Sequence, residues 1–441
     1  MKRLLSLLLC AVLALFCATT AQAAGVSITL TASEYALHYA FDAGAQDPFV
    51  ILEYTTPAEK GWMMLYSEDG HFEGDVSLAY SGAGGKTSVA LTSARTTGSI
   101  GKASTTLPKA ADYQKPTGKS NAKVMDFVLT ETPEGFHYAF NAAGTDYMLL
   151  YWRSKEQTVT QPVYPDENGH YEGDIISELT FARTQFTVQV KSGSGSMKKE
   201  ATVRKGYQAP EAPQRQEGRL SGVTVCIDAG HQENGRFVNE PIGPGLTGSP
   251  SGKGGMAQGT KTNRRESIVC LEIGMLLRDE LLRQGANVIM TREDQTPFHT
   301  TLERCEIAEA GGAQIMLRLH CNNSSNRSKR GIQVYGPLNS DYAKAVADAD
   351  TYREMGQKLL DAMKMRVGMT LANSTGMVRL NDNYVGNNWA KMMCFLVEMG
   401  YLSNPAEEYL LVTPVYQQWL AEGMADGVYE IAVARGWVQA Q

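Results

Sequence analysis

The spacing of hydrophobic and polar residues divides the chain into two parts with different periods. Between residues 25 and 204, apolar and polar residues alternate in short runs, for example at 147–152 and 186–190. An alternation with period two is typical of strands that have one buried face and one wet face. Asp69-Gly70 and Asn168-Gly169 are hairpin-turn sequences between such runs. This part of the chain is therefore predicted to be antiparallel β-structure.

Two stretches within this part repeat one another. His38-Tyr39-Ala40-Phe41 returns as His137-Tyr138-Ala139-Phe140, and the sequence at 70–75 returns with one conservative change at 169–174. Both pairs are separated by the same interval, which chance similarity would rarely give. Residues 25–108 and 124–204 are thus predicted to be two copies of one small antiparallel β-sandwich module. Polar joints follow each copy, at 109–123 and 205–218.

From residue 219 the period changes. Apolar residues at helical spacing predict a helix over 266–284, and Gly285 ends it. Further strands are predicted at 223–227, 288–290, 314–319, 332–335 and 395–397, and further helices at 302–310, 343–365 and 415–434. Because strands and helices alternate throughout, residues 219–441 are predicted to form an α/β three-layer domain with helices on both faces of the sheet.

The first 23 residues have the pattern of a secretory signal peptide. A short positive start precedes an apolar run at 4–16 and a small-residue cleavage site at 21–23. The apolar run is shorter than the roughly 20 residues that cross a bilayer, and no later segment is apolar for long enough. A lipoprotein signal through Cys17 is disfavoured because the bulky Phe16 precedes it. We expect a secreted, extracellular protein without a membrane span.

Composition narrows the function mainly by exclusion. The chain has 441 residues, of which 20% are charged, and a formal net charge of -6. The length predicts two to four domains, and the charge excludes a strongly basic nucleic-acid-binding protein. Five cysteines follow the leader: Cys226, Cys270, Cys305, Cys321 and Cys394. They do not resemble a disulfide framework, so buried thiols that act as small hydrophobic residues are the simpler interpretation.

Four residues with catalytic potential lie at the ends of predicted elements of the α/β domain. His231 and His320 follow two of its strands, Glu266 opens its first helix, and Glu398 follows its last strand. Two imidazoles and one carboxylate can fill three positions of a tetrahedral zinc site and leave the fourth for water. A second carboxylate can then move the proton of that water. The spacing alone equally allows histidines in loops and carboxylates paired with arginines.

Residues from about 220 to 441 resemble the zinc-dependent N-acetylmuramoyl-L-alanine amidases of the Amidase_3 family. The resemblance rests on Ile227-Asp228-Ala229-Gly230-His231, Glu266 with Leu271, Thr291-Arg292, Leu302-Glu303-Arg304, Leu319-His320-Cys321-Asn322 and the segment 397–405. It implies that His231, Glu266 and His320 hold one zinc ion and that Glu398 is the catalytic carboxylate. It also implies that residues 219–441 are the catalytic domain.

Two features depart from the family pattern. The connection between His231 and Glu266 is longer than usual and contains the segment 240–245, and loops at a zinc site shape substrate access. Cys321 stands where the family often has alanine. Because neighbouring strand residues point in opposite directions, Cys321 is not expected to join His320 at the metal. His299, in a loop, is most simply a solvated residue.

The resemblance implies hydrolysis of the amide between N-acetylmuramic acid and L-alanine in peptidoglycan, by a cell-wall-associated enzyme. Arg292, Arg318 and Arg379 are candidates to meet substrate carboxylates, although fixed salt bridges explain them equally well. Two other functions stay open. One is a non-catalytic wall-binding or adhesion protein, and the other is a zinc peptidase that cuts within the stem peptide.

The repeated modules have less specific sequence signals. His71-Glu73-Asp75 and His170-Glu172-Asp174 offer metal-ligating side chains, but polar residues that alternate after a turn usually form the wet face of a strand. Exposed aromatic residues are candidates to contact cell-wall glycan. Peptidoglycan is therefore the expected partner, and no nucleic acid is expected.

Overall fold

The computed structural model describes residues 19–21, 25–78, 80–111, 113, 124–132, 135–143, 148–153, 158–176, 185–191, 198–204, 210–232, 239–247, 255–262, 264–295, 299–368 and 377–440. The expected leader falls outside these residues, apart from a short strand at Thr19–Ala21. Most of the joint at 109–123 and residues 205–209 of the second joint also lie outside them. The chain divides into two compact units, the first ending at Arg204 and the second comprising residues 205–441 with 179–184.

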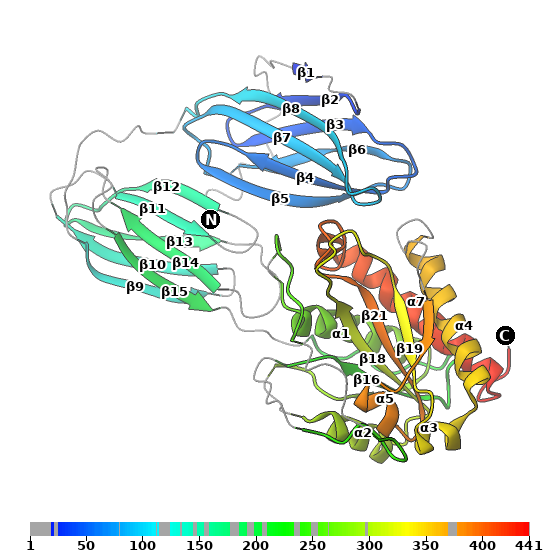
Figure 1. The fold of residues 1–441 in the computed structure, drawn as a ribbon. Helices are drawn as coiled ribbons and strands as arrows, with labels where there is room; N and C mark the ends of the chain where they lie inside the picture. Colours follow the sequence, from blue (N-terminus) through cyan, green and yellow to red (C-terminus); the bar gives the residue numbers. More distant parts are fainter. Residues whose placement is uncertain are drawn as a thin grey trace. The chain divides into compact units, whose positions relative to one another are not determined.

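The first unit consists of antiparallel strands (Figure 1). They are β1 (Thr19–Ala21), β2 (Ile28–Ala32), β3 (Ala36–Asp42), β4 (Phe49–Thr55), β5 (Glu59–Tyr66), β6 (His71–Ser77), β7 (Gly85–Ser93), β8 (Ser99–Leu107), β9 (Val124–Thr132), β10 (Gly135–Ala142), β11 (Met148–Arg153), β12 (Thr158–Val163), β13 (His170–Ile176), β14 (Gln185–Lys191) and β15 (Lys198–Arg204). Burial alternates along several of them, as in β8, which confirms the predicted period-two strands.

These strands form three sheets. Their orders are β1-β2-β3-β6, β13-β10-β9 and β15-β14-β11-β12-β5-β4-β7-β8. In the eight-stranded sheet, β12 pairs with β5 through two residue pairs, Thr158 with Lys60 and Val159 with Glu59. One buried cluster combines Ile28 and Leu37 from the first sheet with Leu52 and Leu91 from the eight-stranded sheet. These two sheets therefore bury apolar residues in a shared core.

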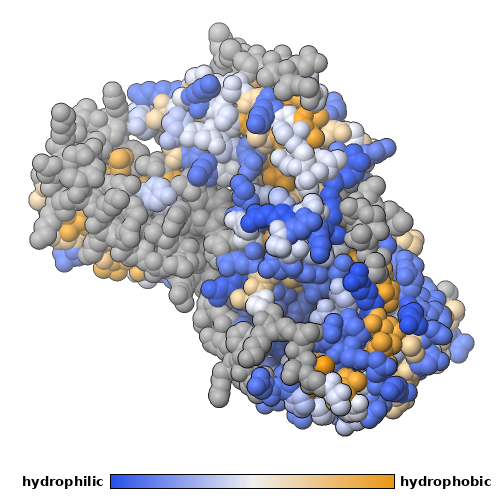
Figure 2. Space-filling model, in the orientation of Figure 1, coloured by the Kyte–Doolittle hydropathy of each residue, from blue (hydrophilic) through white to orange (hydrophobic). Residues whose placement is uncertain are grey.

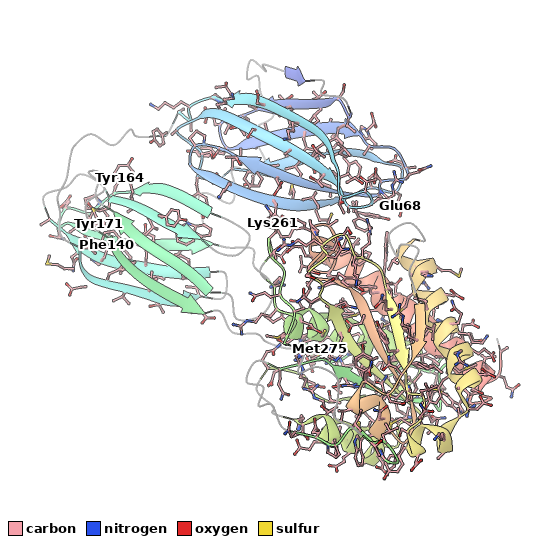
Figure 3. All side chains as sticks on the ribbon, viewed as in Figure 1. Glu68, Phe140, Tyr164, Tyr171, Lys261 and Met275 are labelled. Atoms are coloured by element: carbon pink, nitrogen blue, oxygen red, sulfur yellow. The ribbon has the colours of Figure 1, made fainter. Side chains whose placement is uncertain are left out.

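Some local contacts recur at corresponding positions of the repeated sequences. The rings of Phe41 and Phe72 stack with centroids 4.9 Å apart, and those of Phe140 and Tyr171 stack with centroids 4.6 Å apart. Figure 3 labels the second pair. The turn glycines Gly70 and Gly169 have φ values of 81° and 78°. Side chains with a Cβ rarely adopt this conformation, which accounts for glycine at both turns.

The second unit contains one six-stranded sheet and seven helices among the described residues. Its strands are β16 (Thr224–Ala229), β17 (Asn287–Met290), β18 (Ile315–Asn322), β19 (Gln333–Gly336), β20 (Met377–Leu380) and β21 (Met393–Tyr401). Its helices are α1 (Glu266–Arg283), α2 (Thr301–Ala310), α3 (Asp341–Val346), α4 (Ala349–Val367), α5 (Val385–Trp389), α6 (Glu407–Leu410) and α7 (Pro414–Ala434).

The sheet order is β17-β16-β18-β21-β19-β20. The first four strands are parallel to one another, and β19 runs antiparallel to β21. The sheet is therefore mixed, and the parallel strands β16, β18 and β21 end at the same edge. Parallel strands of this kind carry functional groups at their carboxyl ends.

Helices cover both faces of this sheet. On one face, α1 packs against β16, β17 and β18, α4 packs against β19 and β20, and α7 contacts both helices. Gly274 of α1 lies against Ile227 and Leu319. The other face presents Cys226, which alternates with Ile227 along β16 and shares a buried cluster with Cys305 of α2. The predicted three layers are thus present, and the visible surface of this unit is mostly hydrophilic (Figure 2).

One predicted helix is interrupted. The sequence pattern predicts a single helix over 343–365, whereas the structure has α3 up to Val346 and α4 from Ala349. Asp348 begins the second helix, because its carboxylate accepts a hydrogen bond from Thr351 N. This capping interaction favours a new helix start over continuation of the first. Among the described residues, no helix is both long enough and apolar enough to cross a bilayer.

Candidate metal centre

His231 lies just beyond the end of β16, in an unusual backbone conformation. Gly230 separates it from the strand, and its amide N–H donates to Leu319 O on the neighbouring strand. A Cβ on Gly230 would come within 2.6 Å of His320 Cε1, so only glycine permits this close approach. His231 itself has a φ of 57°, in the left-handed region. This tight turn directs its imidazole back over the edge of the sheet.

Glu266 is the first residue of α1. Its amide N–H donates to Ala257 O, and its carboxylate accepts from Ala257 N at 2.7 Å and from Cys321 N at 3.0 Å. The first turn of a helix also favours a negative charge. The Glu266 carboxylate is therefore held between the loop that precedes α1 and the end of β18.

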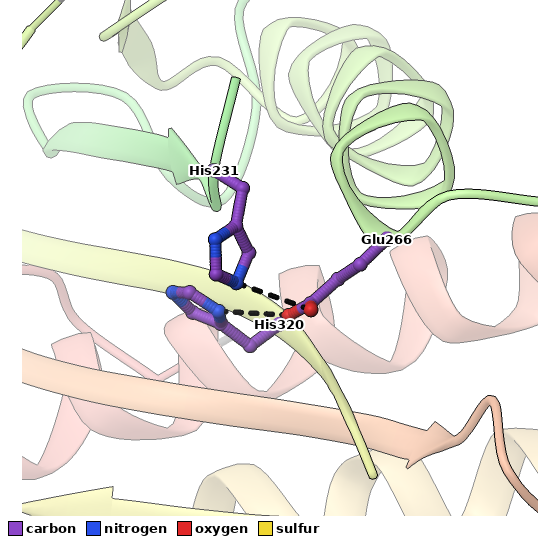
Figure 4. A group of neighbouring side chains, drawn as sticks. All are labelled: His231, Glu266 and His320. Atoms are coloured by element: carbon purple, nitrogen blue, oxygen red, sulfur yellow. Dashed lines mark hydrogen bonds and ion pairs between the residues drawn. The ribbon is translucent and has the colours of Figure 1, made fainter. Parts of the chain in front are cut away.

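His320 lies on β18 and completes a convergent group with the other two (Figure 4). Its Nδ1 is 2.9 Å from Glu266 Oε1, and His231 Nε2 is 3.1 Å from Glu266 Oε2. The two imidazole rings meet edge to face, with centroids 4.9 Å apart. In the part of the chain that the structure describes, only this group of three has metal-ligating atoms that all lie within 4.8 Å of one another.

Charge and burial shape the protonation of this group. Burial alone would raise the pKa of Glu266, but hydrogen bonds and charge from the two imidazoles hold that pKa well below its usual range. Burial lowers the pKa of the His320 imidazole, although its hydrogen bond to Glu266 opposes this effect. A deprotonated carboxylate and a neutral imidazole are the forms in which these residues bind metals.

The donor set fits a zinc ion. Two imidazole nitrogens and one carboxylate are common ligands of catalytic zinc, with a remaining position for water. The backbone N–H groups of Ala257 and Cys321 bind the carboxylate and fix its direction, as partners of metal ligands usually do. The two histidine side chains remain partly accessible to solvent, with exposures of 27% for His231 and 15% for His320. A small ligand can therefore approach the group from solvent.

Glu398 lies on β21, directly beside His320 of β18 in the sheet register. Within the described part of the chain, its buried Oε2 has no hydrogen-bond partner. Burial raises the pKa of Glu398 well above its usual range, the Glu266 carboxylate raises it further, and Arg318 opposes them. A buried carboxylate oxygen without a protein partner is costly, so it indicates a site for water or substrate.

Two of the three arginines that the sequence suggests for substrate binding are engaged inside the protein. Arg292 donates to the carbonyls of Ala229, Gly230 and Ser267. Arg318 pairs with Asp228, its Nε lying 3.1 Å from Asp228 Oδ2. Both arginines are buried, so their geometry favours the structural alternative, and substrate contact by them stays a prediction. Arg379 of β20 is exposed, and its role stays a prediction as well.

The structure adds a buried charged group that sequence reasoning missed. Asp228 is fully buried, and it accepts from Arg304 NH1 at 2.5 Å and from Thr291 Oγ1 at 2.9 Å, in addition to Arg318. Burial alone would raise the pKa of Asp228, but the two guanidinium groups hold it well below its usual range. The only available signal was a charged residue inside an otherwise apolar strand, which requires a partner when buried.

The five cysteines after the leader are buried and free. This agrees with the expectation of thiols that act as small hydrophobic residues. Cys321 is 2% exposed and is not part of the convergent group, although its backbone N–H binds Glu266. His299 is only partly exposed, and its backbone exchanges hydrogen bonds with the Gln232 side chain.

The described part of the long connection after His231 packs on the α2 and α5 side of the sheet. Glu240 Oε1 accepts from Leu302 N at the start of α2. Pro241 O accepts from Trp389 Nε1, and Ile242 O accepts from Asn388 Nδ2. Residues 233–238 and 248–254 lie outside the described residues. The anchored segment is thus fixed to the domain, and its influence on substrate access stays a prediction.

Comparisons with known proteins find similarity over the second unit of the chain. The family model of N-acetylmuramoyl-L-alanine amidase, Amidase_3, matches residues 225–430. A curated relative, "Probable cell wall amidase LytH" of Staphylococcus aureus, is 28% identical over 235 residues, which cover 52% of this chain and 72% of the relative.

Solved structures of amidases are also similar. An N-acetylmuramoyl-L-alanine amidase from Clostridium difficile 630 is 24% identical with a TM-score of 0.38, over 48% of this chain and 96% of that one. AmiC2 of Nostoc punctiforme, also an N-acetylmuramoyl-L-alanine amidase, is 23% identical with a TM-score of 0.36, over 49% and 98%. The family match includes all four predicted site residues, since they lie between 231 and 398. Residues 225–430 of this chain therefore form a domain that is similar to the Amidase_3 family, and the comparisons support N-acetylmuramoyl-L-alanine amidase activity for this domain.

Proposed function

We propose that this enzyme is zinc-dependent and that it cleaves the amide between N-acetylmuramic acid and L-alanine in peptidoglycan. The observation that carries the proposal is the convergence of His231, Glu266 and His320 beside a carboxylate whose Oε2 is buried without a protein partner. A metal site next to a free carboxylate is the arrangement that metal-assisted amide hydrolysis requires.

Each residue has a distinct role in this proposal. His231, Glu266 and His320 hold the zinc ion, and Ala257 and Cys321 orient the Glu266 carboxylate through their N–H groups. When bound, zinc acts as a Lewis acid on the scissile carbonyl and makes water easier to deprotonate. Glu398 accepts the proton of the attacking water as the new carbon–oxygen bond forms. It then donates that proton to the alanine nitrogen as the carbon–nitrogen bond breaks.

Digestion of purified peptidoglycan tests this proposal. The purified protein, with zinc and with a chelator, is incubated with the polymer, and newly exposed amino termini are identified. We expect new L-alanine amino termini with zinc and none with the chelator. Amino termini of other residues would show a stem-peptidase activity instead. Binding to the polymer without any release would show a wall-binding protein.

The remaining predictions about the whole chain are also part of this proposal. We infer that residues 25–108 and 124–204 are two copies of one β-sandwich module, supported by the recurring ring stacks and turn glycines. These modules contact cell-wall glycan, and the domain of 219–441 follows the joint at 205–218. Residues 1–23 direct export, so that the enzyme acts at the cell wall.

A further inference from the structure

The turn that carries His231 has its backbone carbonyls held by two arginines. Arg292, just after β17, donates from Nε to Ala229 O at 2.8 Å and from NH2 to Gly230 O at 3.0 Å. Arg304 of α2 donates from NH1 to Ala229 O at 2.9 Å and from NH2 to His231 O at 3.1 Å. Three consecutive carbonyls of this turn are therefore fixed by guanidinium groups from other elements.

Arg292 also binds the element that carries the second ligand. Its NH2 donates to Ser267 O at 2.6 Å, and Ser267 directly follows Glu266 in the first turn of α1. Arg292 is only 2% exposed, so its position is defined by these contacts. One planar guanidinium thus joins the main chain beside His231 to the main chain beside Glu266. The ligand atoms of those two residues lie 3.1 Å apart.

The turn needs such support because its conformation is unfavourable in isolation. His231 has a φ of 57°, and residues other than glycine rarely adopt this left-handed region without support from their surroundings. The carbonyl groups of this turn are held by buried, charge-assisted hydrogen bonds, which are stronger than neutral ones. These hydrogen bonds offset the unfavourable backbone conformation of His231 and so hold its imidazole in one orientation.

We propose that Arg292 is a positioning residue that sets the separation between His231 and Glu266 and thereby determines the metal affinity of the site. The inference rests on the proposed zinc centre and assigns a role that lies outside its ligands. A lysine cannot replace this function, because a single ammonium group lacks the planar fork that reaches both main-chain segments. Gln295 is a suitable comparison residue, because its side chain donates to the same Ser267 carbonyl at 3.1 Å.

Zinc-binding measurements on the purified protein test the inference. The Arg292→Lys and Arg292→Met variants are compared with Gln295→Met, which loses a bond to α1 only, and with Arg353→Lys on the exposed face of α4. Zinc Kd values come from competition with a chromogenic chelator. We expect the Arg292 variants to raise Kd about 10–100-fold and the two comparison variants to change it less than about threefold.

Several outcomes would overturn the inference. These are an unchanged Kd in Arg292→Lys, a Kd loss in Gln295→Met as large as in Arg292→Lys, or a large kcat loss at saturating zinc with unchanged Kd. If Arg292→Met does not fold, thermal unfolding of Arg292→Lys with chelator and with zinc decides. We expect the zinc-induced rise in Tm to be smaller in Arg292→Lys than in the wild type. An equal lowering of Tm with chelator and with zinc would show a purely structural role. A wild-type protein that binds no zinc would refute the proposed metal site itself, so the two failures are distinguishable.

Discussion

A methyl group at position 230 would press against the ring of His320, one of the proposed zinc ligands. A Cβ built on Gly230 lies 2.6 Å from His320 Cε1 and 2.8 Å from its Nδ1, and it also meets the carbonyl oxygen of Leu319. Ordinary van der Waals contact begins at 3.4 Å. Relief of the ring contact alone requires a movement of about 0.8 Å, the difference between 3.4 and 2.6 Å, and the turn must also shift away from the still closer Leu319 oxygen.

This displacement is large compared with the tolerance of a metal site. Zinc–nitrogen distances are about 2.0–2.1 Å and vary by only about 0.2 Å between good sites. We expect Gly230→Ala to raise the zinc Kd by at least about 100-fold, because one ligand is moved out of range. Overpacking at this position should also lower the free energy of unfolding by about 1–3 kcal/mol.

Gly274 of α1 offers a matched control in the same domain. A Cβ there would meet its nearest neighbour, Ile227 Cγ2, at 3.5 Å, which is ordinary contact. Gly274→Ala should keep the zinc Kd and raise stability by up to about 1 kcal/mol, because alanine favours a helix interior. The assay is zinc competition together with thermal unfolding of both variants. Wild-type zinc affinity in Gly230→Ala would refute the reasoning from close approach.

Other predictions concern stability. Asp228→Asn should lower the free energy of unfolding in urea by about 3–5 kcal/mol, since Arg304 and Arg318 lose their buried counter-charge; a loss below about 1 kcal/mol would contradict this. Burial raises the pKa of Glu407 to about 7 from an ordinary value of 4.5. Its protonated form therefore stabilises the fold at low pH, and this contribution, of about 3 kcal/mol at most, is lost as pH rises through about 7. The free energy of unfolding of the wild type, relative to that of Glu407→Gln, should therefore fall between about pH 4.5 and pH 7. A difference that does not change with pH would refute the raised pKa of Glu407. Zinc at one hundred times its Kd should stabilise the domain by about 2.7 kcal/mol, measured as a chelator-sensitive rise in Tm; an unchanged Tm would contradict metal binding to the native state.

The convergence of the site could be predicted because strand ends constrain where residues lie. β16 and β18 are adjacent and parallel, so the residues that follow or end them, His231 and His320, meet at one edge of the sheet. Glu398 is brought beside His320 by the parallel pairing of β18 and β21. Glu266 depends on the start of α1, which the spacing of apolar residues located at the correct residue. Periodicity and topology therefore place these four residues near one another, whereas their assignment to a zinc site rested on the resemblance to the amidase family.

The partners of the charged residues could not be predicted in the same way. Arg292 and Arg318 lie near strand ends, but the direction of a long side chain depends on which carbonyl or carboxylate is nearby in three dimensions. Sequence spacing does not contain that information. Glu407 and Glu408 form the first turn of α6. In the structure they also bind backbone N–H groups of Gly331 and Thr262, from loops distant in the sequence.

Pairing between the repeated stretches was also beyond sequence reasoning. The pairing of β5 with β12, which joins strands of the two repeated stretches in one eight-stranded sheet, involves only two residue pairs. Strands pair through backbone groups, which every sequence has, so no side-chain pattern predicts this pairing. The break between α3 and α4 had a weak signal in Asp348, a good helix-capping residue. Apolar residues at helical spacing on both sides of Asp348 predicted one continuous helix instead.

In the proposed mechanism, Glu398 performs proton transfer beside zinc held by His231, Glu266 and His320. The most direct test is to purify Glu398→Gln, measure its zinc content, and measure its release of L-alanine amino termini from peptidoglycan next to the wild type. We expect one zinc ion per chain in both proteins and loss of nearly all release in the variant, because glutamine cannot take up the proton. A variant that holds zinc and still cleaves at the wild-type rate would show that Glu398 is not the proton-transfer residue.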